Sequence, residues 1–133
     1  NTKPEMIVRH LLHRKGFRYR LHVSSMPGKP DLVMPRHRAV VLVNGCFWHG
    51  HDCHLFKWPS TRPGWWRAKI DRTRETDREA FAALKADGWR IAIVWECALK
   101  GRTRLGVDEV ADQLSQWLLS KSQEDVSIEG TRP

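Results

Sequence analysis

The order of periodic segments along the chain predicts an α/β fold with a mixed central sheet flanked by helices. A segment with a helical period comes first, three strand-like segments follow, and a helix, a strand and a last helix complete the order. Two of the strand-like segments are almost wholly apolar, which is typical of strands buried on both faces. A chain of 133 residues is long enough for a single domain with its own core.

The first helix is predicted to begin with a capping box. Thr2 can accept a hydrogen bond from a backbone N–H of the first turn, and Glu5 completes the box three residues later. Apolar residues then recur at helical spacing as far as Gly16, where we expect the helix to end.

Four later segments have the composition of strands and two more have a helical period. The expected strands are residues 17–23, 31–35, 38–44 and 89–95. The expected helices are residues 66–86 and 107–119. Residues 122–133 are polar, so we expect a frayed tail there, beyond a domain that covers residues 1–121.

The charge balance points to a polyanionic partner. The chain has 23 Lys and Arg against 15 Asp and Glu, a net charge of +8. A small domain this basic commonly binds nucleic acid, although a solvated basic surface is the simpler alternative. No apolar stretch is long enough to span a membrane and no signal peptide is visible, so we expect a cytoplasmic protein without a membrane partner.

The three cysteines are candidate metal ligands. Residues 45–65 form a long segment without any period, and a segment of this kind is improbable in a small domain unless something holds it. Cys46 and Cys53 lie in this segment, whereas Cys97 follows the last predicted strand. With one His they would complete the four ligands of a structural zinc site. The alternative is that Cys46 and Cys97 are small buried apolar residues.

Spacing alone leaves the fourth zinc ligand open. Three histidines, His49, His51 and His54, lie close to Cys46 and Cys53 in the sequence. Each of them has a ring nitrogen suited to zinc.

A second candidate metal site is centred on Asp31. This residue stands at the head of one predicted strand, and Val43 stands near the end of the next. Carboxylates so placed hold Mg²⁺ against a phosphate in many nucleases, and Mg²⁺ needs only one or two protein oxygens. Glu5 is a candidate second carboxylate. The simpler alternatives are a turn-ending role for Asp31 and a capping role for Glu5.

Several motifs resemble those of the very-short-patch repair (Vsr) DNA mismatch endonucleases. The matching blocks are residues 27–31 (PGKPD), 44–49 (NGCFWH), 55–57 (LFK), 88–90 (GWR) and 94–99 (VWECAL). The resemblance extends in order from about Thr2 to Leu118 with matching spacings. Enzymes of that family nick one strand 5′ to the thymine of a T:G mismatch, and their fold is similar to the restriction-endonuclease (PD-(D/E)xK) core.

The resemblance implies a role for each residue of a Mg²⁺ site. Asp31 is the implied catalytic Mg²⁺ ligand, the backbone carbonyl of Val43 is the second protein oxygen, and Glu5 is a helix-borne carboxylate near the metal. His49 takes the place of the usual E-x-K pair as general base or proton shuttle, acting through a metal-bound water. At Asn44 the family has a supporting His. Because an amide cannot exchange a proton near neutral pH, we expect lower activity or greater reliance on His49.

The resemblance also implies the zinc ligands and the DNA contacts. Zinc would be held by Cys46, His51, Cys53 and Cys97, which leaves His49 free. The expected wedge beside the mismatch is made of Phe47, Trp48 and Trp66. The expected contacts with the mismatch or with phosphates are Lys69, Lys57, Arg62, Arg67, Lys100 and Arg102. We expect Trp89, Trp95 and Trp117 to pack in the core, and the sequence does not decide between core and surface for Trp58 and Trp65.

The sequence therefore predicts a Mg²⁺-dependent endonuclease, stabilised by zinc, that nicks double-stranded DNA at T:G mismatches. A monomer suffices to nick one strand, and the resemblance implies a bacterial protein of the cytoplasm and nucleoid with mismatch-repair proteins as partners. Two alternatives remain open at this point. One is a restriction-like or site-specific nicking enzyme of the same fold that is not restricted to T:G. The other is a zinc-stabilised DNA-binding module without catalysis.

Overall fold

The computed structural model describes residues 2–131 as one mixed α/β domain. Five strands form the sheet, in the order β1 (Arg20–Leu21), β2 (Leu32–Met34), β3 (Ala39–Asn44), β4 (Arg90–Trp95) and β5 (Val126–Ile128). The helices are α1 (Lys3–Arg14), the 3₁₀ helix η1 (Pro35–His37), α2 (Pro63–Ala86), α3 (Glu96–Leu99) and α4 (Val107–Leu119). β1, β2 and β3 are antiparallel neighbours, whereas β3, β4 and β5 run parallel.

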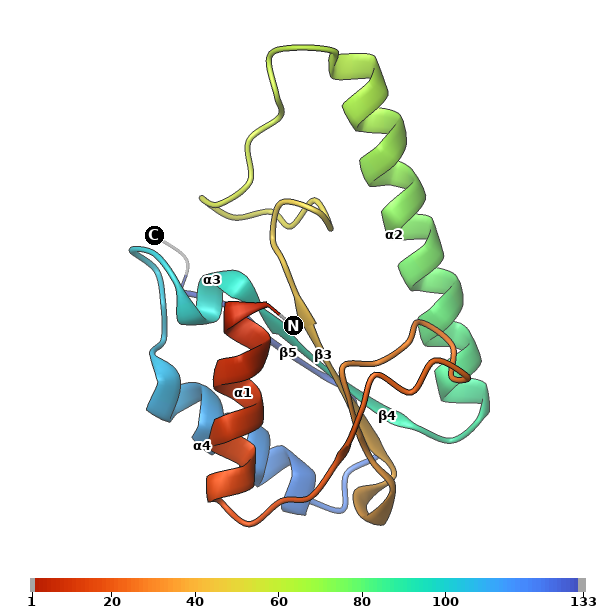
Figure 1. Ribbon diagram of the computed structural model, residues 1–133, viewed down its shortest axis with the longest axis vertical. Helices are drawn as coiled ribbons and strands as arrows, with labels where there is room; N and C mark the ends of the chain where they lie inside the picture. Colours follow the sequence, from red (N-terminus) through yellow and green to blue (C-terminus); the bar gives the residue numbers. More distant parts are fainter. Residues whose placement is uncertain (1, 132–133) are drawn as a thin grey trace.

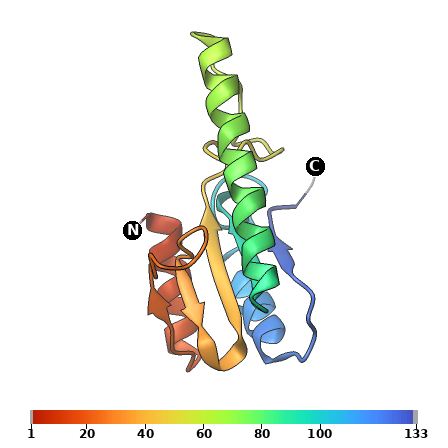
Figure 2. The same ribbon diagram turned by 90° about the vertical axis from the view of Figure 1, so that its right-hand side faces the viewer.

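Helices cover both faces of the sheet (Figures 1 and 2). Successive residues of β3 point to opposite faces, and both faces are buried. Val41 belongs to the apolar cluster that includes Leu12 of α1 and Leu114 of α4. Val40 belongs to the other cluster, which includes Leu84 of α2. Burial on both faces explains why this strand is an almost continuous apolar run.

The amino-terminal half of α2 extends past the end of the sheet, beside the long connection from β3 (Figure 1). Gly50 allows the connection to pack closely on this helix. It has a φ of +62°, and a Cβ atom there would lie 2.6 Å from Cγ2 of Ile70. The Arg74 side chain donates a hydrogen bond to the Gly50 carbonyl. The loop and the projecting helix thus support one another away from the main core.

The predicted start of α1 is confirmed, whereas the first strand and the start of α2 differ from the prediction. Thr2 Oγ1 accepts a hydrogen bond from the Glu5 amide at 3.3 Å. The strand predicted over residues 17–23 shortens to two residues, because Phe17 turns into the core and His22 takes a left-handed backbone. α2 begins at Pro63, before the expected residue 66, since proline suits the first helical turn.

The segment as far as Thr131 corrects the prediction of a frayed tail over residues 122–133, of which residues 132 and 133 lie outside the described part of the chain. Residues Val126–Ile128 form β5, which pairs with β4. The Asp125 side chain accepts a hydrogen bond from the Ile91 amide at 2.8 Å. Ile128 is only 1% exposed. One buried apolar residue in a three-residue strand gives too weak a sequence pattern to predict. No helix among residues 2–131 is long and apolar enough to cross a membrane.

Replacing Ile128 by Ala is expected to lower the free energy of unfolding by about 2–4 kcal/mol, because it empties a buried site against β4. The control is Leu119→Ala, since Leu119 at the end of α4 is 69% exposed, and its expected cost is about 0.5 kcal/mol or less. Urea unfolding of the two variants measures both changes in the free energy of unfolding. Equal, small effects would mean that β5 contributes nothing to the core.

Candidate active site and metal centre

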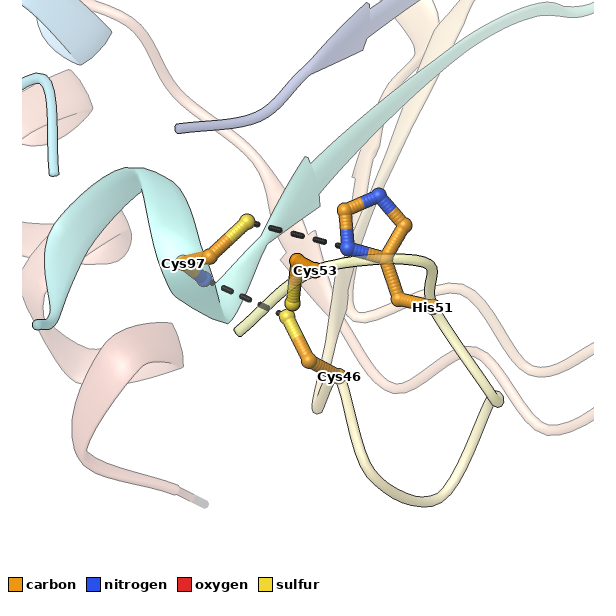
Figure 3. A group of neighbouring side chains, drawn as sticks. All are labelled: Cys46, His51, Cys53 and Cys97. Carbon is orange, nitrogen blue, oxygen red and sulfur yellow. Dashed lines mark hydrogen bonds between the residues drawn. The ribbon is translucent and has the colours of Figure 1, made fainter. Parts of the chain in front are cut away.

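Three thiols and one imidazole converge where the loop after β3 meets α3 (Figure 3). The ligand atoms of Cys46, His51, Cys53 and Cys97 all lie within 4.8 Å of one another. Three sulfur atoms and one ring nitrogen are a standard tetrahedral donor set for zinc. The cluster can therefore bind a metal such as zinc. Of the three histidines that spacing left open, the structure brings His51 to the thiols.

Backbone amides and an aromatic ring orient the ligands of this cluster. The Cys97 amide lies 3.3 Å from the Cys46 sulfur, and the Gly130 amide lies 3.3 Å from the Cys97 sulfur. The His51 ring stacks on Trp95, with the ring centroids 4.0 Å apart. Contacts of this kind fix the direction of metal ligands.

Burial raises the pKa of the Cys46 thiol and that of the Cys97 thiol. The nearby Cys53 thiol acts in the same direction on both. Three ionised thiols at this spacing would repel one another strongly in a medium of low dielectric constant. A divalent cation bound among them would instead favour the ionised form of each thiol, because the thiolate is the form that binds metal.

A second cluster consists of Glu5, His22 and Asp31, whose ligand atoms also lie within 4.8 Å of one another. His22 Nε2 lies 2.8 Å from Glu5 Oε2 and 3.9 Å from Asp31 Oδ1. The Val43 amide donates a hydrogen bond to Asp31 Oδ2 at 2.7 Å. The structure thus brings Asp31, Glu5 and Val43 together. The sequence analysis missed His22, because nothing in its spacing separates it from an ordinary strand residue.

The surroundings of Asp31 disfavour its charged form. Its pKa is raised from 3.8 to about 6, first by burial and then by the neighbouring carboxyl group of Glu5. The hydrogen bond from the Val43 amide opposes this rise but does not cancel it. Glu5 is itself only 4% exposed. Two crowded carboxyl groups are a donor pair that a hard divalent cation satisfies.

His49 belongs to neither cluster and pairs instead with an acid on α2. Its Nδ1 lies 2.6 Å from Oδ2 of Asp77. The edge of its ring faces Trp95, at a centroid distance of 6.1 Å. The sequence analysis missed Asp77, because 28 residues separate it from His49 and it lies on a heavily charged helix. Asn44 ends β3, is buried, and is the register partner of Trp95.

An aromatic cluster lies on the same loop and on the first turn of α2. The Phe47 ring is 5.2 Å from the rings of Trp48 and Trp66. Trp48 is 54% exposed, which is unusual for a large apolar side chain. Trp58 and Trp65, left open by the sequence, are 39% and 46% exposed and so lie at the surface.

Cationic side chains cover the rim of this cluster. Arg62 and Lys69 approach the Trp65 ring, and Arg67 lies over the Trp58 ring, 4.3 Å from its centroid. The expected phosphate contacts are all exposed: Lys57, Arg62, Arg67, Lys69, Lys100 and Arg102. Exposed aromatic rings interleaved with cations are typical of surfaces that bind nucleic acid.

The remaining predicted residues lie partly as expected. Trp117 is buried in the core, whereas Trp89 is half-buried beneath Arg38. Trp95, expected in the core, belongs to neither apolar cluster; it is half-buried and stacks on His51 of the thiol cluster. His54 lies outside the thiol cluster, and its Nδ1 is 3.2 Å from Oγ1 of Thr103.

Residues 1–55 match the model of a family described as DNA mismatch endonuclease Vsr. The chain is 50% identical over 99 residues to the type II nicking enzyme V.XorIIP of Xanthomonas oryzae pv. oryzae, which covers 74% of this chain and 73% of that protein. It is 42% identical over 118 residues to the DNA mismatch endonuclease Vsr of Escherichia coli, covering 89% and 76%. It is also 40% identical over 101 residues to the type II nicking enzyme V.NmeAIP of Neisseria meningitidis, covering 76% and 72%.

These similarities, together with the two ligand clusters, define a DNA endonuclease that hydrolyses a phosphodiester bond. The chain belongs to the Vsr DNA mismatch endonuclease family. It is therefore a DNA-nicking enzyme, and the alternative of a non-catalytic DNA-binding module is wrong.

Replacing Asp31 by Asn is expected to stabilise the fold at about pH 8 by roughly 1–3 kcal/mol. The pKa of Asp31 is higher in the folded chain, about 6 against 3.8, so its ionisation disfavours folding. This penalty is absent at pH values below the pKa of the unfolded chain. It grows as the pH rises from that pKa to the higher pKa of the folded chain, and it is complete above the latter. Urea unfolding at about pH 8 and about pH 4 checks this.

The matched control for that comparison is Asp112→Asn, because Asp112 is an exposed acid that forms a surface ion pair with Lys15. Its expected effect is small at both pH values. A loss of stability in Asp31→Asn at the higher pH would contradict the account of this site.

Proposed function

We propose that the enzyme nicks one strand of double-stranded DNA 5′ to the thymine of a T:G mismatch, in a Mg²⁺-dependent reaction. The observation that carries the proposal is the pair of carboxyl groups from Asp31 and Glu5, of which that of Asp31 accepts a hydrogen bond from the Val43 amide. The E. coli relative named DNA mismatch endonuclease Vsr supports the choice of substrate.

Asp31 and Glu5 supply oxygen ligands suited to Mg²⁺, and the carbonyl of Val43 is the proposed second protein oxygen beside Asp31. The fit rests on the chemistry of the donors: both carboxyl groups lie within one ligand cluster, and Glu5 is buried. When bound, Mg²⁺ supplies stabilisation of the charge that develops on the phosphate and lowers the pKa of water.

His49 is the proposed general base. Asp77 accepts a hydrogen bond from the Nδ1–H of His49, so the lone pair that takes a proton is on Nε2. A carboxylate in this position also stabilises the imidazolium that forms. Asn44, at the end of β3, cannot take or give a proton, so the proposed reaction depends on His49 for that step.

The aromatic cluster is the proposed mismatch wedge. Phe47, Trp48 and Trp66 form one group of contacting rings, and Trp48 is exposed. Inserting rings into a duplex requires unstacking, which costs less at a mismatch than at a paired step. Lys69 lies beside this group on α2 and is proposed to meet the mismatch or its phosphates. The other proposed phosphate contacts are Lys57, Arg62, Arg67, Lys100 and Arg102.

Zinc is the proposed occupant of the thiol cluster, with a structural role. Four protein ligands, from Cys46, His51, Cys53 and Cys97, leave zinc no open position for a substrate. The domain is proposed to be a restriction-endonuclease-like core, with β5 completing its sheet. We propose that it acts as a monomer on the bacterial nucleoid in the cytoplasm, with mismatch-repair proteins as partners.

A second candidate is nicking that is not restricted to T:G mismatches. The relatives at 50% and 40% identity are named type II nicking enzymes. Asn44, which stands where the Vsr enzymes have a His, is consistent with a change in the reaction or its target. The chemistry of Asp31 and His49 would be the same in both candidates.

The test uses end-labelled duplexes that differ only in one base pair, T:G or T:A, with and without Mg²⁺. We expect nicking of the thymine strand of the T:G duplex alone, with the T:A duplex slower by about a hundredfold or more. Asp31→Ala is expected to lower the rate by about a thousandfold or more, because the cation loses its principal ligand.

The matched control is Asp112→Ala, which should nick at the normal rate. Asp112 is exposed on α4 and belongs to neither ligand cluster. Asp31-dependent cutting of both duplexes alike would favour the second candidate. Cutting that persists in Asp31→Ala would contradict both.

A further inference from the structure

His22 lies against the two carboxyl groups of the proposed cation site. Its Nε2 points at the carboxyl groups of Glu5 and Asp31, at 2.8 Å and 3.9 Å. The residue lies directly after β1, and its side chain is partly exposed. The ring nevertheless completes a three-membered ligand cluster with the two acids.

The backbone at His22 is held in an unusual conformation that directs the ring to the site. Its φ of +46° lies in the left-handed region, which is uncommon for residues other than glycine. The His22 amide donates a hydrogen bond to the Asp31 carbonyl at 3.2 Å, which keeps the two residues adjacent. Conformations of this kind persist where the surroundings fix them, and they concentrate at functional sites.

We propose that His22 is a third protein ligand of the cation held by Asp31, with Nε2 as the ligand atom, and that it favours Mn²⁺ over Mg²⁺. The inference rests on the proposed function, since it takes the cation site at Asp31 as given. Imidazole is a softer ligand than carboxylate and suits transition-metal ions, whereas Mg²⁺ prefers oxygen. Coordination replaces the Nε2 hydrogen bond to Glu5, and the ring proton then resides on Nδ1.

The cluster differs from the two other histidine sites near it. His49 is engaged by Asp77, and His51 lies with the three thiols. His22 faces the carboxyl groups of Glu5 and Asp31 and no thiol of that cluster. A mixed set of two carboxyl groups and one imidazole is chemically distinct from the all-oxygen sets typical of Mg²⁺.

The test measures Mn²⁺ and Mg²⁺ binding to the zinc-loaded protein without DNA. Free Mn²⁺ is followed by electron paramagnetic resonance, and Mg²⁺ by its competition with Mn²⁺. His22→Gln is expected to weaken Mn²⁺ binding by about tenfold or more and Mg²⁺ binding by about threefold or less. His10→Gln is the matched control, because His10 is an exposed histidine on α1 outside the cluster. It should bind both ions as the unmodified protein does.

Nitrogen hyperfine modulation of the bound Mn²⁺ tests the ligand directly. We expect the modulation of a coordinated imidazole in the unmodified protein and in His10→Gln, and its loss in His22→Gln. Modulation that survives in His22→Gln, or is absent from the unmodified protein, would overturn the assignment. Thermal unfolding shows whether the variant remains folded, and His22→Ala serves as a second variant.

Asp31→Asn separates failure of this inference from failure of the proposed function. If Asp31→Asn abolishes Mn²⁺ binding while His22→Gln changes neither affinity nor modulation, only the role of His22 is wrong. If Asp31→Asn leaves Mn²⁺ binding intact, the proposed cation site at Asp31 is wrong, and the inference falls with it.

Discussion

The tether between the loop after β3 and the start of α3 is the interaction on which the rest of the site depends. Cys46, His51 and Cys53 belong to the loop, and Cys97 belongs to α3 (Figure 3). Ordering a loop costs on the order of 1 kcal/mol of backbone entropy per residue. The loop lies largely outside the two apolar clusters, so the binding of a metal by the four ligands would offset this cost.

The tether also bears on the proposed function, because the proposed wedge residues and the proposed general base lie between its ligands. Phe47, Trp48 and His49 stand between Cys46 and His51 in the sequence. Their positions follow from those of the flanking ligands. The pair of His49 with Asp77 and the contact of Phe47 with Trp66 then join the loop to α2. A site built in this way is fixed by its ligands more than by a hydrophobic core.

Strand direction brings the second cluster to the same end of the sheet. β2 runs antiparallel to β3, so Asp31 at the start of β2 lies beside the end of β3. β4 runs parallel to β3, so Asn44 and Trp95 end their strands side by side, and Cys97 follows. Glu5 reaches this edge from the first turn of α1. A carboxylate pair and a thiol cluster thus share one edge without being close in sequence.

Local patterns and motifs predicted the parts of this arrangement that depend on neighbouring residues. The capping box at Thr2, the apolar runs of β3 and β4, and the grouping of Cys46 with Cys53 are all visible in short stretches. The contacts of His22 and Asp77 depend on how distant elements pack, so neither residue could be assigned from spacing. β5 was missed because Ile128 is its one buried residue, and one apolar position does not make a recognisable strand pattern. The left-handed backbone conformation of His22 likewise could not be predicted, because the conformational propensity of histidine does not indicate it.

Amide hydrogen exchange, with and without removal of zinc by a chelator, tests most directly whether this tether assembles the site. The account predicts that residues 45–62 lose protection when zinc is removed, while the amides of β3 and β4 exchange as slowly as before. Equal protection of residues 45–62 in the zinc-loaded and zinc-free protein would contradict it.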